Sequence, residues 1–293
     1  MHFALVVNPT SGKRDGEAIA SRAHERLIAA GHTTITVQGA DVASARDQLK
    51  QAIDTGLDGV LVVGGDGALH AVLDHVADSD LVFGLIPAGT GNDTARSLGI
   101  PIKDPDAALD LVIAGHIRTI DLARADESYV ATVVASGFDS KVNERANAMR
   151  WPRGNMRYNI GIVAELGTFK PLPFTLTLDG KTIERKAMLV AVGNSSSYGG
   201  GLRLCEGAVL DDGLLDVVII NPLSKLKLLR VFPKLYKGTH TTIPEFERHL
   251  VREAIISSPG VVAYGDGERL GALPMTTRIC PGALRVFAPP TPA

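Results

Sequence analysis

Residues 1–122 alternate short apolar runs with amphipathic stretches, and this alternation restricts the fold more than any other feature. Four runs rich in branched apolar side chains predict strands at residues 3–7, 33–37, 59–63 and 81–86. Between them, apolar residues such as Ile19 and Leu27 recur at helical spacing, and Gly31 is expected to end that helix. Asp104 before Pro105 predicts the start of a later helix. Strands that alternate with helices pack as a parallel sheet with both faces covered, so we expect an α/β domain.

Beyond Asp121 the pattern becomes mainly β. Residues 174–178 alternate apolar and polar side chains and run into Asp179-Gly180, a dipeptide typical of a hairpin turn. Further strands are predicted at residues 129–135, 188–192, 215–220 and 261–264, and helices at residues 156–166 and 224–236. A last strand is predicted at residues 283–287, and the pattern leaves its domain open. The second half is therefore expected to be an antiparallel β domain.

Composition and charge exclude several classes of protein. The chain of 293 residues, 45% of them hydrophobic, is typical of a globular protein with two domains. A formal net charge of −2 provides no general basic field, so no nucleic-acid partner is expected. Cys205 and Cys280 lie outside any C-x-x-C pattern, which argues against a zinc site or disulfide framework. Because no apolar run approaches the ~20 residues that span a bilayer, we expect a cytoplasmic protein that contacts membranes only peripherally.

The tetrapeptide Gly64-Gly65-Asp66-Gly67 stands between the strand at 59–63 and the helical pattern that begins at Ala68. Glycines tolerate positive φ and let a ligand approach the backbone, while a helix N-terminus offers unpaired N–H groups to phosphates. Asp66 is an anion at this place and requires a bridging cation, which favours a nucleotide bound with Mg²⁺. The alternative is a tight turn with a helix-capping aspartate.

Two more polar loops follow predicted strands. Asn8-Pro9-Thr10-Ser11-Gly12-Lys13 comes after the first strand, and Pro87-Ala88-Gly89-Thr90-Gly91-Asn92-Asp93 comes after the fourth, with Arg96 one helical turn later. The first loop lacks the spacing of a Walker A motif and, alone, is best explained as an ordinary turn. Because parallel strands end at one edge of their sheet, all three loops are expected to converge on a ligand site there.

The second half contains two acidic turns and one basic helical stretch. The first turn, Asp211-Asp212-Gly213-Leu214-Leu215-Asp216, is a β-turn or a cation site. The second, Gly265-Asp266-Gly267-Glu268, is a solvated turn or a pair of carboxylates that accepts a proton from a substrate hydroxyl. Residues 224–237 combine leucines and aromatics with lysines and arginine. Such a helix either packs its apolar stripe inward or lies on an anionic membrane surface.

Taken together and in this order, the motifs resemble the bacterial diacylglycerol kinase and related lipid kinase family, whose catalytic domain is shared with sphingosine and ceramide kinases. The matching pieces are Asn8–Lys13, Gly64–Gly67, Gly89–Asp93, Asp121, Asp212–Asp216 and Asp266–Glu268. They span nearly the whole chain. The Gly-Gly-Asp-Gly turn alone is also found in NAD kinases, so the full series carries the resemblance.

The resemblance implies a doubly wound, Rossmann-like N-terminal nucleotide domain and a C-terminal antiparallel β-sandwich, with the active site between them. It implies a first domain of residues 1–122 that is rejoined by the final strand at 283–293, and a lipid kinase domain at 123–282. ATP would contact Asn8, Pro9, Thr10, Ser11, Gly12, Gly64, Gly65, Asp66, Gly67, Ala68, Leu69, His70 and Thr90.

The same resemblance implies the catalytic and metal-binding groups. One Mg²⁺ would be bound by Asp212 and the backbone carbonyls of Val209 and Leu214. A second would be surrounded by an acidic network of Asp66, Asp93 and Asp121. Asp266 and Glu268 would include the general base, with Glu268 favoured.

The implied reaction is transfer of the γ-phosphoryl group of ATP to the hydroxyl of diacylglycerol or a similar lipid, which yields phosphatidic acid. Peripheral membrane contact follows from such a substrate, and an exposed β-edge in the second domain would suit a homodimer. Two positions depart from the family pattern, because Ala68 and Gln38 stand where a threonine is usual. The alternatives are a kinase of a soluble substrate, of the NAD kinase type, and a non-catalytic nucleotide or lipid sensor.

Overall fold

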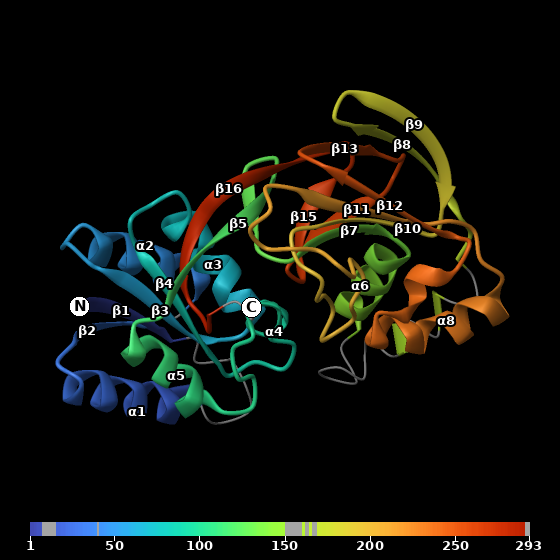
Figure 1. The fold of residues 1–293 in the computed structure, drawn as a ribbon. Coiled ribbons are helices and arrows are strands. Elements are labelled where there is room, and N and C mark those ends of the chain that lie inside the picture. Colours follow the sequence, from blue (N-terminus) through green and yellow to red (C-terminus); the bar gives the residue numbers. More distant parts are fainter. Residues whose placement is uncertain (8–15, 40, 150–159, 162–163, 166–168, 291–293) are drawn as a thin grey trace.

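The computed structural model describes residues 1–7, 16–39, 41–149, 160–161, 164–165 and 169–290. It shows the expected fold class, an α/β unit followed by an antiparallel β-sandwich (Figure 1). The four predicted strands of the first unit are confirmed as β1 (His2–Val7), β2 (Thr33–Val37), β3 (Gly59–Gly64) and β4 (Val82–Pro87). They pair in parallel in the order β2-β1-β3-β4.

Helices cover both faces of this parallel sheet. On one face, α1 (Gly16–Ala29) and α5 (Pro105–Ala114) bury Leu27 and Val112 in a cluster with Phe3. On the other, α2 (Val42–Ile53) and α3 (Asp66–Val76) pack in a cluster with Val60 and Val62. The sheet is thus doubly wound. The predicted start of α5 is confirmed, because the side chain of Asp104 accepts a hydrogen bond from the Ala107 N–H. A short helix, α4 (Asp93–Leu98), follows β4.

The second unit is a sandwich of two sheets. A six-stranded sheet runs in the order β12-β11-β10-β7-β14-β15. Its strands are β7 (Val133–Gly137), β10 (Leu189–Gly193), β11 (Leu215–Ile220), β12 (Phe246–Val251), β14 (Val262–Gly265) and β15 (Glu268–Ala272). It packs against β8 (Leu172–Leu178), β9 (Lys181–Ala187) and β13 (Glu253–Ser257). The predicted hairpin joins β8 to β9, with Asp179 and Gly180 both at positive φ.

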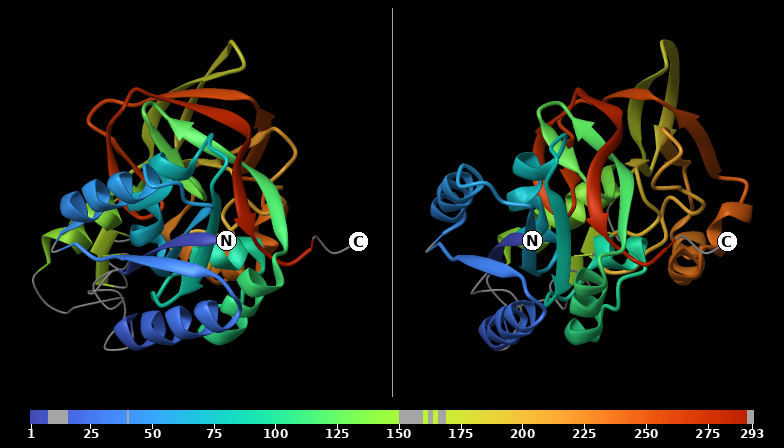
Figure 2. Two further views of the ribbon diagram at one scale, coloured as in Figure 1. Left: turned by 90° about the vertical axis from the view of Figure 1, so that its left-hand side faces the viewer. Right: turned by 60° about the vertical axis from the view of Figure 1, so that its left-hand side comes forward.

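One long strand connects the two units. β16 (Met275–Phe287) pairs first with β13 and β5 (Ile117–Ala125), and its end lies parallel to β4 (Figures 1 and 2). The strand predicted at residues 283–287 is therefore the last part of β16, and it extends the parallel sheet of the first unit. Because one strand belongs to both units, their hydrogen-bonded sheets are continuous.

The predicted strand at 129–135 is wrong in one respect. The chain forms two strands there, β6 (Ser128–Val130) and β7, with a break at Ala131 and Thr132. The N–H groups of these two residues donate to the side chain of Asp266 instead of to a neighbouring strand. The break therefore has a physical cause that lies more than a hundred residues along the chain.

Two helices cover the outer face of the six-stranded sheet. The predicted helix at 224–236 is confirmed as α8 (Lys225–Lys237), whereas α6 (Phe138–Ala148) was not predicted. Gly137 makes the turn into α6 with φ of 105°, and a Cβ there would lie 2.7 Å from the carbonyl oxygen of Met188. The helix predicted at 156–166 lies mostly outside the described residues. No helix of the described part is long and apolar enough to cross a membrane. Both cysteines are free, but only Cys205 is buried.

Candidate active site

The Gly64-Gly65-Asp66-Gly67 segment forms the predicted strand–turn–helix junction between β3 and α3. Gly65 is the N-cap of α3 in an extended conformation, and none of the three glycines has a positive φ. The tolerance of glycine for positive φ is therefore not what this turn uses. A Cβ on Gly65 would instead lie 3.0 Å from the Cα of Gly89. The absence of a side chain lets the loop after β4 pack directly on the turn.

Asp66 joins the turns that follow β3 and β4. Its half-buried carboxylate accepts N–H hydrogen bonds from Asp93 (3.1 Å) and Thr94 (3.2 Å) at the start of α4. Burial and the nearby carboxylate of Asp93, with a smaller effect of Asp266, raise the pKa of Asp66 to about 6. A cation at this place would favour the charged form and offset the cost of burial.

Asp93 connects the first unit to the second. Its buried carboxylate accepts hydrogen bonds from Ser197 Oγ (2.6 Å) and from the N–H groups of Gly200 (2.7 Å) and Gly201 (2.8 Å). These donors belong to the loop between β10 and β11, far along the chain. The Asp93 side chain thus fixes that loop against α4, where the turns after β3 and β4 meet the sandwich.

Asp121 lies in a different set of contacts. Its Oδ1 accepts from the Gly282 N–H and its Oδ2 from the Gly213 N–H, each at 2.7 Å. Both oxygens are therefore used to anchor the loop before β11 against β16. Among the described residues, Asp66 is hydrogen-bonded to the Asp93 N–H, whereas Asp121 accepts only from backbone donors, so its place in the expected acidic network stays a prediction. Within the described residues, no three His, Cys, Asp or Glu side chains are grouped as metal ligands.

The residues predicted to bind a metal in the second unit lie on that anchored loop. Asp212 is exposed, and its Oδ1 accepts from the Leu214 N–H at 3.0 Å. Val209, three residues earlier, is 47% exposed. One carboxylate and the two carbonyls of Val209 and Leu214 are hard oxygen donors, the type that Mg²⁺ prefers. The donor set therefore suits that ion.

Asp266 and Glu268 have contrasting environments. Asp266 is buried, and its carboxylate accepts from the Ala131 N–H (2.8 Å), the Thr132 N–H (2.9 Å) and Thr132 Oγ1 (2.5 Å). Burial raises the pKa of Asp266 in spite of these bonds. Glu268 is exposed, and its Oε1 lies 3.2 Å from the position that a Cβ on Gly67 would take. The structure therefore brings Glu268 to the first turn of α3. Asp266 instead holds Ala131 and Thr132, the two residues between β6 and β7.

One cavity of about 370 Å³ extends from this acidic region across the second unit. Asp66, Thr90, Asp93 and Asp266 line one end. Apolar side chains from α6, β10, β11 and α8 line the remainder, among them Phe138, Val142, Leu189, Ile220, Phe232 and Leu235. Such a cavity, mostly apolar with a few polar groups at one end, suits a ligand with a long apolar part and a polar head.

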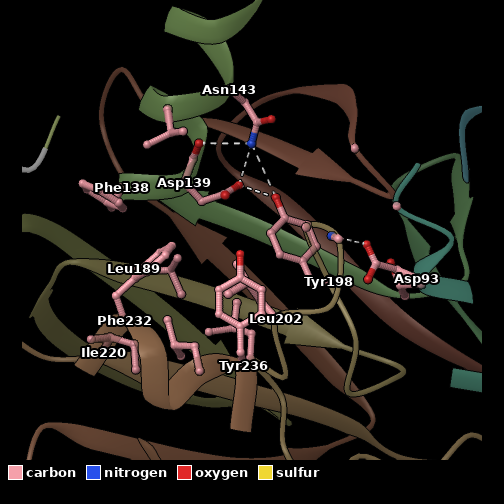
Figure 3. Close-up of a pocket in the computed structure, with 18 of the residues that line it drawn as sticks. Asp93, Phe138, Asp139, Asn143, Leu189, Tyr198, Leu202, Ile220, Phe232 and Tyr236 are labelled. Atoms are coloured by element: carbon pink, nitrogen blue, oxygen red, sulfur yellow. Dashed lines mark hydrogen bonds between the residues drawn. The ribbon is translucent and has the colours of Figure 1, made fainter. Parts of the chain in front are cut away.

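A polar cluster interrupts the apolar wall. Tyr198 and Asn143 both donate hydrogen bonds to Oδ2 of Asp139, which lies in the first turn of α6 (Figure 3). Burial raises the pKa of Asp139 to about 6. Sequence reasoning missed this cluster and the cavity, because α6 was not predicted and the lining residues have the same spacing as core residues. The one available signal was Asp139 itself, a carboxylate directly after the apolar pattern of β7.

The other predicted residues lie as follows. Asn8, Pro9, Thr10, Ser11 and Gly12 are outside the described residues, as is Lys13. Ala68 and Leu69 are buried in α3, and Thr90 is exposed at the cavity. The half-buried His70 has an Nδ1 without a hydrogen-bond partner among the described residues. Arg96 donates to the Gly91 carbonyl at 3.3 Å. Gln38 is exposed after β2, with its N–H donating to Gln48.

Comparison with known proteins places this geometry in a family. Residues 2–125 match the diacylglycerol kinase catalytic domain, and residues 132–288 match the YegS C-terminal NAD kinase beta sandwich-like domain. A diacylglycerol kinase of Mycobacterium tuberculosis is 43% identical over 97% of this chain and 94% of the relative.

Solved structures agree with the fold. A diacylglycerol kinase from Bacillus anthracis superposes with a TM-score of 0.76 at 21% identity, covering 99% of this chain and 97% of the other. An NAD kinase from Archaeoglobus fulgidus in complex with ATP gives a TM-score of 0.55 at 13% identity, over 98% and 93% of the chains. With both halves matched by family models and a relative of 43% identity over nearly its whole length, this chain belongs to the bacterial diacylglycerol kinase family.

Proposed function

We propose that this chain is a lipid kinase that uses ATP and Mg²⁺ to phosphorylate the hydroxyl of diacylglycerol or a similar lipid, forming phosphatidic acid. The observation that carries the proposal is the continuity of the cavity, whose lining passes from apolar side chains to Asp66, Thr90, Asp93 and Asp266. An acyl chain fits the apolar part, and the lipid hydroxyl then lies at the acidic end. A soluble substrate of the NAD type would leave the apolar part without an occupant.

The nucleotide is proposed to lie on the first unit, at the carboxyl edge of its parallel sheet. The N-terminus of α3, whose cap lacks a side-chain hydrogen bond, would turn its positive dipole end toward the phosphates. Gly64, Gly65, Asp66, Gly67, Ala68, Leu69 and His70 would contact ATP from this side, and Thr90 and Asn8 to Gly12 from the adjoining loops. The close contact of Gly65 with Gly89 makes one continuous surface of the turns after β3 and β4.

Glu268 is proposed as the general base. Its side chain is exposed, projects from β15 onto Gly67 and makes no hydrogen bond to another described residue, so the carboxylate is available to accept the hydroxyl proton. Among the described residues, the hydrogen bonds to the Asp266 carboxylate come from Ala131 and Thr132, which suits a positioning role. Asp266 would thereby hold the turn that presents Glu268.

Mg²⁺ is proposed at two places on the basis of donor chemistry. Asp212 with the carbonyls of Val209 and Leu214 would hold one ion, and Asp66, next to Asp93, would face the ion that accompanies ATP. When bound, Mg²⁺ neutralises phosphate charge during transfer. The raised pKa of Asp66 fits a carboxylate that meets a cation only when the nucleotide is present.

The proposed assignment of residues to domains is 1–122 with 283–293 for the nucleotide part and 123–282 for the lipid part. The end of β16 beside β4 supports returning the last residues to the first part. A homodimer is also proposed, through the outer edge of β9, which pairs with β8 and with no other described strand. Sedimentation velocity at two protein concentrations tests the dimer, and a single monomeric species would contradict it.

The function is tested by incubating the protein with γ-labelled ATP, Mg²⁺ and diacylglycerol in mixed micelles. We expect label in phosphatidic acid, loss of transfer without Mg²⁺, and no label in NADP when NAD replaces the lipid. Label in NADP with none in lipid would instead support the NAD kinase alternative. ATP binding that raises the melting temperature without transfer to any alcohol would support the sensor alternative, for which Ala68 is the sequence argument.

A further inference from the structure

Helix α8 has apolar side chains on two opposite faces. Leu228, Val231 and Leu235 lie on the inner face and line the cavity. Leu226 and Leu229 lie on the outer face, 69% and 55% exposed. Packing against the sandwich therefore accounts for only part of the apolar surface of this helix, and the two exposed leucines lack a partner within the described chain.

The outer face also carries the positive charge of the helix. Leu226, Leu229, Arg230, Pro233, Lys234 and Lys237 each lie three or four residues from another member of this set, so they form one stripe along the helix. Arg230, Lys234 and Lys237 are exposed and form no ion pair with any described residue, whereas Lys227, off this stripe, pairs with Glu245 at 2.5 Å. The helix contains no acidic residue, although the whole chain has a net charge of −2.

Two aromatic side chains of α8 lie between the stripe and the cavity. Phe232 and Tyr236 belong to the cavity lining, and Tyr236 is also 50% exposed at the edge of the outer face. Figure 3 shows both side chains directed from α8 into the cavity, on the side opposite Asp139 and Asn143. The cavity lining therefore reaches the edge of the outer face at Tyr236.

We propose that the outer face of α8 docks on the surface of an anionic phospholipid bilayer. Leu226 and Leu229 would enter the interface between headgroups and acyl chains, while Arg230, Lys234 and Lys237 contact lipid phosphates. Exposed leucines next to unpaired cations match such a surface in both apolar character and charge sign. Docking in this orientation would bring the lipid substrate past Phe232 and Tyr236 without passage through water, an inference that rests on the proposed function.

The docking is tested by vesicle flotation of the full chain. We expect binding to vesicles of phosphatidylglycerol and phosphatidylcholine, weak binding to phosphatidylcholine alone, and weakening of the former by salt. The double variant L226Q/L229Q and the triple variant R230Q/K234Q/K237Q are each expected to reduce binding to the anionic vesicles at least about tenfold. The matched controls are I28Q, which alters an apolar residue of similar exposure on α1, and K50Q/K181Q/K186Q, which removes three exposed lysines elsewhere.

The outcomes separate docking from catalysis. Phosphorylation of a water-soluble, short-chain diacylglycerol is expected to be equal in wild type and in both α8 variants, because no altered residue lines the cavity. Wild-type vesicle binding by both α8 variants, equal losses in the controls, or no binding by the wild type would each overturn the docking surface. If neither the wild type nor any variant phosphorylates the soluble lipid, the proposed function is contradicted. The flotation comparison still tests whether α8 docks on the bilayer.

Discussion

The carboxylate of Glu268 lies directly against Gly67, with its Oε1 3.2 Å from where a Cβ on residue 67 would be. Glu268 begins β15 in the sandwich, and Gly67 lies in the first turn of α3 in the α/β unit. The contact therefore joins the proposed base to the proposed phosphate-binding turn. It also gives the last glycine of the turn a role that does not depend on its φ, which is not positive.

A methyl group at this contact is expected to move the base without unfolding the protein. In G67A, the backbone accepts alanine because residue 67 is helical, and alanine favours a helix by about 1 kcal/mol over glycine. The exposed Glu268 side chain would be displaced by a few tenths of an ångström or more. We expect kcat to fall about tenfold or more with an unchanged or higher melting temperature. Wild-type kcat in G67A would contradict the placement of the base.

Replacing Asp266 and Glu268 one at a time by the corresponding amide is expected to distinguish the general base from the positioning residue. E268Q is expected to lower kcat by about 10²–10⁴-fold, with the melting temperature and the KM for ATP unchanged, because Glu268 is exposed. D266N places an amide where Ala131 and Thr132 donate three hydrogen bonds, so it is expected to lower the free energy of unfolding by about 1–3 kcal/mol. Activity and urea unfolding measured on both variants check this; stability loss in E268Q alone would reverse the assignment.

Removing the carboxylate of Asp93 is expected to loosen the boundary between the units. In D93A, the donors from Ser197, Gly200 and Gly201 lose their acceptor, at a cost of about 3 kcal/mol in the free energy of unfolding. S97A is the matched control, because Ser97 donates a single hydrogen bond to Ser195 across the same boundary. We expect a loss of no more than about 1 kcal/mol there, measured by urea unfolding. Equal losses in the two variants would show that Asp93 is not the main anchor.

The sequence could predict the elements whose signals are local. The Asp179-Gly180 hairpin, the Asp104 cap and the four parallel strands follow from neighbouring residues, and so does the convergence of the turns after β3 and β4. The break at Ala131 was not predictable, since its cause is the distant Asp266. The cavity was equally hidden, because residues that line an empty space have the same periodicity as residues that fill a core.

Asp212 is expected to determine the Mg²⁺ requirement. D212N keeps an oxygen that can accept from the Leu214 N–H but loses the charge, so the fold is retained and the affinity for the ion falls. We expect the Mg²⁺ concentration for half-maximal activity to rise about tenfold, with no change in melting temperature in the presence of a chelator. D211N is the matched control, since Asp211 is the neighbouring carboxylate and pairs with Arg118. The same rise in D211N would point to a general charge effect.

Asp139 is expected to make stability depend on pH. Its pKa is about 6 in the folded protein and near 3.8 when unfolded, so the folded state binds the proton more tightly. The free energy of unfolding of the wild type should therefore fall as pH rises from about 4 to about 6 and stay low above that. Asp66, whose pKa is also about 6, contributes in the same direction.

D139N removes this contribution while keeping an oxygen that accepts from Tyr198 and Asn143. We expect the variant to match the wild type near pH 4 and to exceed it at pH 7 by on the order of 2 kcal/mol, because an amide has no charge to desolvate. Urea unfolding at four pH values between 4 and 7.5 measures the difference. A residual slope in D139N is expected from Asp66, and D66N/D139N should abolish most of it. If D139N were less stable than the wild type at pH 7, the surroundings of Asp139 would stabilise its charged carboxylate, and the expectation would be wrong.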